Sequence, residues 1–451
     1  MTREDREKDE SLNNRRLEIG RRAFLASAAA AGAGMAFGIG SGSASGAASA
    51  DELNCAIIGT GSQGMVLLRD ALRIPGIRFK AVCDIWEYSR RYGSGVVRST
   101  KQPVPNVYTD YREMLASEED LDAVLIATPD WMHAEHAVAC IEAGLHVYCE
   151  KEMSNSLEGA RRIVVAAQGS DRLVQIGHQR RSNPFYQHGL QLIEKDEAVG
   201  RITSCYGQWH RAAQGKATVP DRLKISKDIL EKYGYGTMDR FRNWRWYREY
   251  SGGPIADLGS HQIDIFNWVL HTGPSQVIAS GGVDYYEDGR EWYDQILANY
   301  VYETEAGPVR AHYQVLNTSS FGGYFETFMG DRGTINISED VSKCFYVPEP
   351  TKSAPEWVDK ADRVEKQGSS AIALIGESRK EGEEQKETIK PELEKPIHQF
   401  HLENFFSAIR DGTPLTCPVE VGYETAVSVL NVNKAIEQGS AVDFESSDFE
   451  A

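Results

Sequence analysis

The sequence predicts an α/β domain built on a parallel sheet, followed by an α+β domain with a large, mostly antiparallel open sheet. Between residues 51 and 180, continuous apolar runs alternate with helical stretches of about 10 to 15 residues. This is the pattern of βαβ units whose sheet is buried on both faces. From residue 181 to 451, runs with period-two alternation follow one another with few helices between them, which is typical of an antiparallel sheet.

The first domain is predicted from five apolar runs. They are LNCAIIG from residue 53, IRFKAVCD from 77, LDAVLIATPD from 121, GLHVYCEKE from 144 and RLVQIGHQ from 172. We expect a helix over 62–73 and another that begins near Trp86. The chain has seven cysteines, an odd number, and no Cys-x-x-Cys pair. Cys55, Cys83 and Cys149 lie inside the apolar runs, so we expect buried free thiols rather than disulfides or a zinc site.

The second domain is predicted from five further runs. They are RITSCYGQWHR from residue 201, SQVIASGGVDYY from 275, DQILANYVYE from 294, GPVRAHYQVL from 307 and GGYFETFMG from 322. Residues 348–395 are rich in Lys and Glu and indicate a charged surface insertion, followed by helices over 397–410 and 419–438. The sheet would expose a large aromatic-rich face, so we expect a homo-oligomer that packs through it.

Residues 1–50 have the composition of an export signal. Their apolar run is mostly Ala, Gly and Ser, too weakly apolar for a membrane-spanning helix, and it ends in an Ala-x-Ala-like site at Ala50. The string GRRAFLA around Arg21 and Arg22 resembles the twin-arginine signal. That resemblance implies passage through the twin-arginine (Tat) translocon and a periplasmic or other extracytoplasmic location. The net charge of −17 argues against nucleic acid or an anionic membrane as partner, and no stable membrane anchor is expected because twin-arginine signals are addresses rather than anchors.

A glycine-rich turn follows the first strand. Gly59, Gly61 and Gly64 have the G-x-G-x-x-G spacing and open a helix, where backbone amides can bind a pyrophosphate. Asp84 lies twenty residues after Gly64, at the end of the second strand, where a carboxylate accepts hydrogen bonds from ribose hydroxyls and repels a 2′-phosphate. The spacing therefore predicts NAD as the cofactor, with NADP less favoured.

Four segments together resemble one family. ATPDWMHAEHAVACIEAGLHVYCEKE, GGPIADLGSHQIDIFNW, VQIGHQRRSNPFY and the GTGSQG turn are similar to motifs of the glucose–fructose oxidoreductase/inositol dehydrogenase (Gfo/Idh/MocA) family. The resemblance covers most of residues 51–345. It implies that Lys151 contacts the reacting hydroxyl and the nicotinamide ribose, and that Asp257 and His261 form the family's Asp/His pair, with His261 as acid/base. Glu152 stands where the family has proline, and Asp130 where it often has asparagine.

The same residues suit hydride transfer from an alcohol, which needs a base for the hydroxyl proton and a donor for the developing alkoxide. His261 is a base near neutrality, and its i, i+4 spacing places it on one helix face with Asp257, a stripe that Asp264 extends. Lys151 ends a parallel strand, the edge at which such sheets bind ligands. The alternative for His261 is a surface or capping histidine without a catalytic role. The alternative for His133 is that it caps a helix. No further cluster completes a metal shell, so no metal is predicted.

The expected site residues fall into two groups. The predicted cofactor-binding residues are Gly59, Gly61, Ser62, Gln63, Gly64, Asp84, Thr128, Pro129, His133, Glu150 and Lys151. The residues that could line a sugar site are Arg180, Trp244, Arg245, Tyr247 and Asp264, with domain-interface packing as the alternative for them.

These observations predict an NAD(P)-dependent oxidoreductase that acts on a secondary alcohol of a sugar, polyol or related compound. Because free NAD is scarce outside the cytoplasm, an exported enzyme would need a tightly held cofactor that is recycled within one site. A redox-neutral glycosidase or lyase that oxidises its sugar transiently is the alternative. A non-catalytic sugar-binding protein is a second alternative, against which Lys151, Asp257 and His261 argue.

Overall fold

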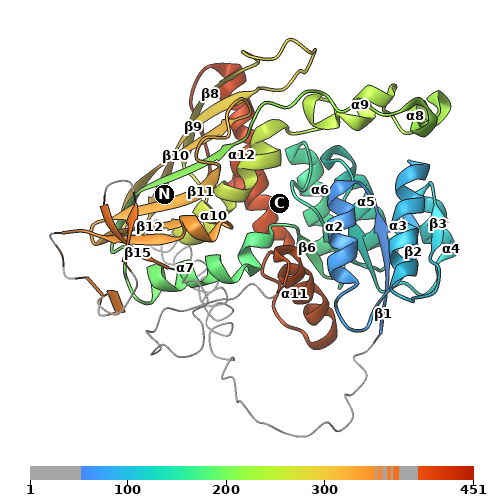
Figure 1. The fold of residues 1–451 in the computed structure, drawn as a ribbon, viewed down its shortest axis with the longest axis horizontal. Helices are drawn as coiled ribbons and strands as arrows, with labels where there is room; N and C mark the ends of the chain where they lie inside the picture. The colour runs from blue at the N-terminus through green and yellow to red at the C-terminus, as the bar shows by residue number, and fades with distance from the viewer. Residues whose placement is uncertain are drawn as a thin grey trace, which may run out of the picture.

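The computed structural model describes residues 52–350 and 395–451 and, between them, residues 352, 354–355, 357–358, 363–366 and 369–374. Two sheets organise this part of the chain, one in each domain (Figure 1). The predicted export signal, residues 1–50, lies outside the described residues. In the described part of the chain, no helix is both long enough and apolar enough to cross a membrane.

The first domain has a six-stranded parallel sheet in the order β3-β2-β1-β4-β5-β6. β4 is Ala-Val-Leu-Ile and buried throughout, because helices cover both faces of the sheet. The strands are β1 (Leu53–Ile58), β2 (Ile77–Cys83), β3 (Asn106–Tyr108), β4 (Ala123–Ile126), β5 (His146–Cys149) and β6 (Val174–Ile176). The helices are α2 (Ser62–Ala71), α3 (Glu87–Ser99), α4 (Tyr111–Ser117), α5 (Asp130–Glu142) and α6 (Leu157–Gln168).

The second domain has a ten-stranded sheet in the order β14-β15-β13-β12-β11-β7-β10-β9-β8-β16. All its pairs are antiparallel except β7 with β10. The strands are β7 (Ile202–His210), β8 (Gln276–Gly282), β9 (Gln295–Thr304), β10 (Gly307–Leu316), β11 (Tyr324–Gly330), β12 (Gly333–Ile337), β13 (Phe345–Pro348), β14 (Arg363–Lys366), β15 (Ser369–Ala373) and β16 (Val442–Asp443). The longer helices are α7 (Pro184–Glu194), α10 (Ser260–Leu270), α11 (Ile397–Asp411) and α12 (Val419–Gln438).

One face of the second sheet is covered by helices. α10 and α12 pack on it, and buried and exposed residues alternate along β9 as this one-sided cover requires. On the other face the side chains of Ile278 and Leu297 remain 51% and 39% exposed. α11 returns to the first domain, where Leu402, Phe405 and Phe406 join the core formed by β1 and α2. Residues 397–411 therefore complete the first domain although they lie between β15 and α12 of the second domain in sequence.

The predicted fold class is confirmed, and the ten predicted runs all contain strands. All seven cysteines are buried and free, as expected. The insertion predicted over 348–395 lies largely outside the described residues, but its described parts include β14 and β15, which extend the edge of the sheet. The sequence pattern also did not predict β3, β12, β13 and β16, which are short, or the helices between β7 and α10.

Candidate active site

A cavity of about 1050 Å³ lies between the two domains. Its walls include the turns that follow β1, β2, β4 and β5, so it opens at the carboxyl edge of the parallel sheet. Ligands of such sheets bind at this edge. The second domain contributes the end of β7 and the start of the α10 segment, which places Trp209, Asp257 and His261 in the same cavity.

The glycine turn has the geometry that a dinucleotide requires. Gly59 has φ +89°, and a Cβ there would lie 2.7 Å from the backbone of Ala127. A Cβ on Gly64 would lie 1.9 Å from the carbonyl oxygen of Gly59, so this glycine lets the helix approach the strand. A Cβ on Gly61 would meet nothing within 4 Å, because Gly61 faces the cavity. A pyrophosphate can therefore approach the first amides of α2 at Gly61, where no side chain intervenes.

Asp84 lies at the end of β2 with both carboxylate oxygens fixed. Its Oδ2 accepts from the Thr60 amide at 2.8 Å and the Thr60 hydroxyl at 3.2 Å, and its Oδ1 accepts from the Trp86 amide at 2.8 Å. Burial raises the pKa of Asp84, while these three hydrogen bonds act to lower it. The carboxylate lines the cavity and keeps lone pairs for the hydroxyls of a ribose.

Lys151 and Asp257 meet from opposite domains. Lys151 follows β5, and its Nζ donates to the carbonyl oxygen of Asp257 at 2.6 Å and lies 3.9 Å from the Asp257 carboxylate. Asp257 belongs to a π-helical turn (Ile255–Gly259) that leads into α10. Its carboxylate also contacts Arg245 Nε at 3.0 Å and Arg211 Nη2 at 3.5 Å. Burial would raise the pKa of Asp257, but Arg245, Lys151 and Arg211 together hold it well below its ordinary value.

His261 lies one helical turn beyond Asp257 and is 8% exposed. Its ring stacks on Trp209, with ring centroids 5.3 Å apart, and the Arg180 guanidinium lies 5.5 Å from the centroid of the same indole. Burial, followed by the charges of Lys151 and Arg180, lowers the pKa of His261 well below its ordinary value. The imidazole is therefore neutral at physiological pH and can accept a proton.

Three further polar side chains surround the strand ends. His133 lies in the first turn of α5, and its ring nitrogens lie 2.7 Å from the carbonyl oxygens of Thr128 and Glu152. It links the ends of β4 and β5, so it does not cap backbone amides of its helix. Burial lowers the pKa of His133 to about 4 and raises the pKa of Asp130 to about 7 and of Glu152 to about 8. Both carboxyl groups retain one oxygen with no hydrogen-bond partner among the described residues.

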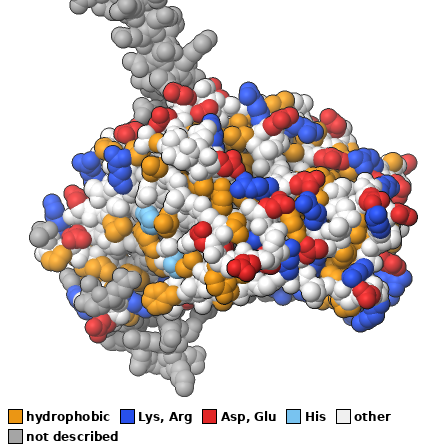
Figure 2. Space-filling model, turned by 90° about the horizontal axis from the view of Figure 1, so that it is seen from above, with side chains coloured by type: hydrophobic (Ala, Val, Ile, Leu, Met, Phe, Trp, Pro, Cys, Tyr) orange, Lys and Arg blue, Asp and Glu red, His pale blue; other side chains and the backbone are white. Residues whose placement is uncertain are grey.

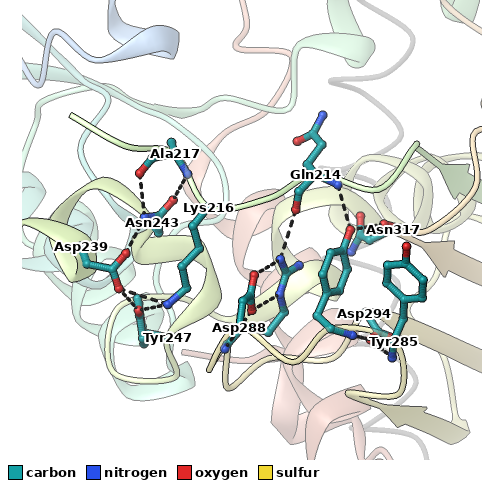
Figure 3. Close-up of polar contacts among 12 residues, drawn as sticks. Gln214, Lys216, Ala217, Asp239, Asn243, Tyr247, Tyr285, Asp288, Asp294 and Asn317 are labelled. Carbon is teal, nitrogen blue, oxygen red and sulfur yellow. Dashed lines mark hydrogen bonds and ion pairs between the residues drawn. The ribbon is translucent and has the colours of Figure 1, made fainter. Parts of the chain in front are cut away.

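Residues 211–250 form an extension, which we call the arm, between β7 and the α10 segment. It carries the short helices α8 (Lys227–Lys232) and α9 (Met238–Arg242) and reaches from the second domain over the first (Figure 1). Polar contacts within the arm tie its first residues to the α9 segment (Figure 3). Asn243 bonds both the amide and the carbonyl oxygen of Ala217, and Lys216 donates to Asp239 and Tyr247. The arm is therefore held together by hydrogen bonds between its own residues.

The far end of the arm packs against the strand end that carries Asp84. The Trp86 indole donates to the Leu223 carbonyl oxygen at 2.6 Å and meets Phe241 edge to face, with ring centroids 5.8 Å apart. Tyr235 meets Trp131 in the same way at 5.5 Å. Phe241 and Tyr235 both line the cavity, so the arm closes it beside the predicted ribose site.

Two family models match the chain. An oxidoreductase family NAD-binding Rossmann fold matches residues 53–178, and the C-terminal alpha/beta domain of the same family matches residues 230–444. The chain belongs to the Gfo/Idh/MocA oxidoreductase family. The two matches leave residues 179–229 between them, a stretch that includes the first half of the arm.

Curated relatives and solved structures agree with this membership. The chain is 34% identical to an inositol 2-dehydrogenase/D-chiro-inositol 3-dehydrogenase of Shouchella clausii over 181 residues, 39% of this chain and 51% of that protein. It is 32% identical to an inositol 2-dehydrogenase of Rubrobacter xylanophilus over 166 residues, 36% of this chain and 45% of that protein. The chain spans about half the length of the curated relatives it matches.

Among solved structures, levoglucosan dehydrogenase in complex with NADH shares the fold, with TM-score 0.65 and 18% identity over 88% of this chain and 100% of that one. The WlbA dehydrogenase of Bordetella pertussis, in complex with NADH and UDP-GlcNAcA, gives TM-score 0.62 and 16% identity over 87% of this chain and 99% of that one.

Most predicted site residues of this Gfo/Idh/MocA chain meet in the cavity. The lining includes Gly59, Gly61, Ser62, Gln63, Asp84, Thr128, Pro129, His133, Glu150, Lys151, Trp244, Arg245, Asp257 and His261. Gly64 does not line it and acts in packing. Arg180, Tyr247 and Asp264 do not line it either, which corrects their assignment to the sugar site. Each is buried with a charged partner: Arg180 with Glu326, Tyr247 with Asp239, and Asp264 with Arg181.

The sequence interpretation missed Trp209 and Arg211, which line the cavity at the end of β7. Both fall in the run RITSCYGQWHR, so their position at a strand end was the available signal. It also missed the arm. Among the described residues, no group of three or more His, Cys, Asp or Glu side chains could hold a metal ion.

We expect Glu152→Gln to change the pH dependence of stability. The folded protein holds the Glu152 proton up to about pH 8, whereas the unfolded chain releases it near its ordinary pKa of 4.5. Wild-type stability attributable to this group is therefore present below about pH 4.5 and is lost as the pH rises toward 8. Glutamine has no proton to lose, so the variant should gain stability over wild type by up to about 4 kcal/mol between pH 5 and 8.

Thermal midpoints of the two proteins at several pH values measure this difference. Glu287→Gln is the matched control, because Glu287 is exposed in the loop between β8 and β9. A gap between wild type and Glu152→Gln that stays constant with pH would contradict the expectation.

Proposed function

We propose that this protein is an NAD-dependent oxidoreductase that acts on a secondary alcohol of a sugar, polyol or related compound. The observation that carries the proposal is the meeting of Lys151, Asp257 and His261 in the cavity that the glycine turn and Asp84 also line. A neutral buried imidazole beside an ammonium group suits removal of a hydroxyl proton and stabilisation of the oxygen that loses it.

NAD, when bound, supplies the hydride acceptor for this chemistry. The open approach at Gly61 and the carboxylate of Asp84 fit its pyrophosphate and ribose. His261 would take the hydroxyl proton, and Lys151 would hold the substrate oxygen. Asp257, whose carbonyl oxygen accepts from Lys151, would position that ammonium group.

The cofactor is held tightly and recycled within the site. The arm supports this, because Phe241 and Tyr235 line the cavity beside Asp84 and the arm is held together by its own polar contacts. A retained cofactor also favours the second candidate, a redox-neutral glycosidase or lyase in which a sugar is oxidised, undergoes elimination and is reduced again. Both candidates use the same three residues.

One experiment separates the two candidates. Purified protein is denatured and its released dinucleotide is quantified, and the native protein is incubated with sugars and with glycosides in the absence of added NAD. Net oxidation predicts a lasting rise at the nicotinamide absorbance band that an added second substrate reverses. Redox-neutral chemistry predicts glycoside cleavage with no net change in the nicotinamide absorbance. A protein that binds sugar but contains no dinucleotide and takes none up would refute both.

We expect Phe241→Ala to speed dissociation of NAD about tenfold or more. The substitution removes the edge-to-face contact with Trp86 and opens the cover over the cavity. Cofactor retained after gel filtration, as a function of time, measures the rate. Phe321→Ala is the control, because Phe321 is 86% exposed. Equal retention in wild type and Phe241→Ala would show that the arm does not hold the cofactor.

Export and assembly complete the proposal. Residues 1–50 would direct the folded protein to the twin-arginine translocon and out of the cytoplasm, which fractionation of producing cells tests. A second copy would cover the exposed face of the large sheet, where Ile278 and Leu297 face solvent. Sedimentation at micromolar concentration tests whether the chain is a homo-oligomer.

A further inference from the structure

The cavity has an excess of positive charge around Asp257. Lys151, Arg211 and Arg245 all lie within ion-pair distance of this one carboxylate. The molecule as a whole carries a net charge of −17, and acidic and basic side chains are interspersed on the face shown in Figure 2. Three cations around one partly buried carboxylate is therefore a local arrangement, which the net negative charge of the molecule does not explain.

Part of this positive charge has no partner among the residues that the structure describes. Arg245 uses only its Nε toward Asp257, and its guanidinium lies 4.2 Å from the centroid of the Trp244 ring. Its side chain is 44% exposed, and Nη1 and Nη2 make no hydrogen bond or ion pair with any described residue. Arg211 donates from Nε to Asn317 at 2.7 Å, and its Nη1 is likewise without a described partner. Both arginines line the cavity, so these donors are available to a ligand.

The acidic side chains near Asp257 do not balance the excess positive charge around it. Glu339 lies 3.3 Å from Arg180, a guanidinium that it shares with Glu326, so this carboxylate pairs away from Asp257. Asp130 and Glu152 are buried, and burial raises their pKa values to about 7 and about 8, so Glu152 is mostly protonated at neutral pH and Asp130 is about half protonated. An oxidised nicotinamide would add one more positive charge. Electrostatics at the end of the cavity beside Arg211 and Arg245 thus favour a substrate that carries negative charge.

We propose that the substrate carries an oxyanion, a carboxylate or a phosphate attached to the sugar or polyol, and that Arg245 and Arg211 bind it. This rests on the proposed function, because it names the substrate class of the same site. Arginine donors form forked, charge-assisted hydrogen bonds with oxyanions, and the flanking Trp244 ring fixes the plane of the Arg245 guanidinium. Lys151 and His261 then act on a hydroxyl elsewhere on the same molecule.

Binding to the NAD-loaded protein tests the proposal without turnover. Calorimetry compares glucose with glucuronate and glucose 6-phosphate, and galactose with galacturonate and galactose 6-phosphate, so that each set shares a ring and differs at one carbon. We expect an anionic member of at least one set to bind about tenfold or more tightly than its neutral parent, with an affinity that falls as salt rises. The uronate and phosphate members identify which oxyanion is preferred.

Arg245→Gln should abolish this preference, so that the anionic and neutral members of a set bind with affinities within about twofold of each other. Arg98→Gln is the control, because Arg98 is exposed on α3 and outside the cavity. The proposal is overturned if no anionic sugar binds better than its parent, or if the preference survives in both Arg245→Gln and Arg211→Gln. Arginine-dependent uronate binding without any hydride chemistry would refute only the proposed function, and oxidation of neutral sugars alone would refute only this inference.

Discussion

Replacing Lys151 with methionine is expected to lower kcat about 10²- to 10³-fold while the protein stays folded and still binds NAD. The Lys151 side chain is 11% exposed, and its ammonium group lies 2.6 Å from the Asp257 carbonyl oxygen, in the cavity. Methionine keeps the approximate length of the side chain and removes the ammonium donor proposed for the substrate oxygen. Asp257 keeps Arg245 and Arg211 as partners, so its carboxylate is not left unpaired.

Steady-state turnover and cofactor content of the same preparation measure the effect. Lys434→Met is the matched control, because Lys434 is exposed on α12, far from the cavity lining. A Lys151→Met protein that keeps its cofactor and turns over within about threefold of wild type would remove Lys151 from the chemistry.

His261→Asn is expected to lower kcat about 10²- to 10⁴-fold, since the substitution removes the proposed proton acceptor. Burial and the nearby charges of Lys151 and Arg180 hold the pKa of His261 well below its ordinary 6.5. An imidazole with a lowered pKa stays neutral as the pH falls through 6. The wild-type rate of alcohol oxidation should therefore persist through the range in which an ordinary histidine would be lost, and decline only at lower pH.

The control for this variant is the histidine that directly follows the same helix. His271 follows α10, is 53% exposed in its side chain and pairs with Glu194, so His271→Asn should leave kcat unchanged. His261→Asn activity equal to wild type, with cofactor still bound, would remove His261 from the chemistry.

The features predicted correctly are those that neighbouring residues encode. The glycine turn and Asp84 lie within one strand-helix-strand unit, and a parallel sheet brings the ends of its strands to one edge. Asp257 and His261 share a helical face because of their spacing alone. Each of these features can be predicted from the local sequence together with the general rules of the fold.

The errors have a common physical origin. Asp264 follows the same helical stripe as His261, but Arg181 and Thr425 bind its carboxylate behind α10, and these partners are distant in sequence. Arg180 has a side chain that would suit a sugar site, but it pairs with the buried Glu326 instead. Nothing in a single sequence tells an arginine that pairs internally from one, such as Arg245, that keeps free donors. The return of α11 to the first domain is a long-range packing outcome of the same kind.

The buried state of the seven thiols has a consequence for where the chain can function. A disulfide forms only when a thiolate reaches a partner, and burial raises the pKa of Cys140 and of Cys344 to about 12. The folded chain therefore neither needs an oxidant to complete its structure nor offers a reactive sulfur to one. Its integrity is independent of the redox potential around it, so the same fold can form in a reducing compartment and persist in an oxidising one.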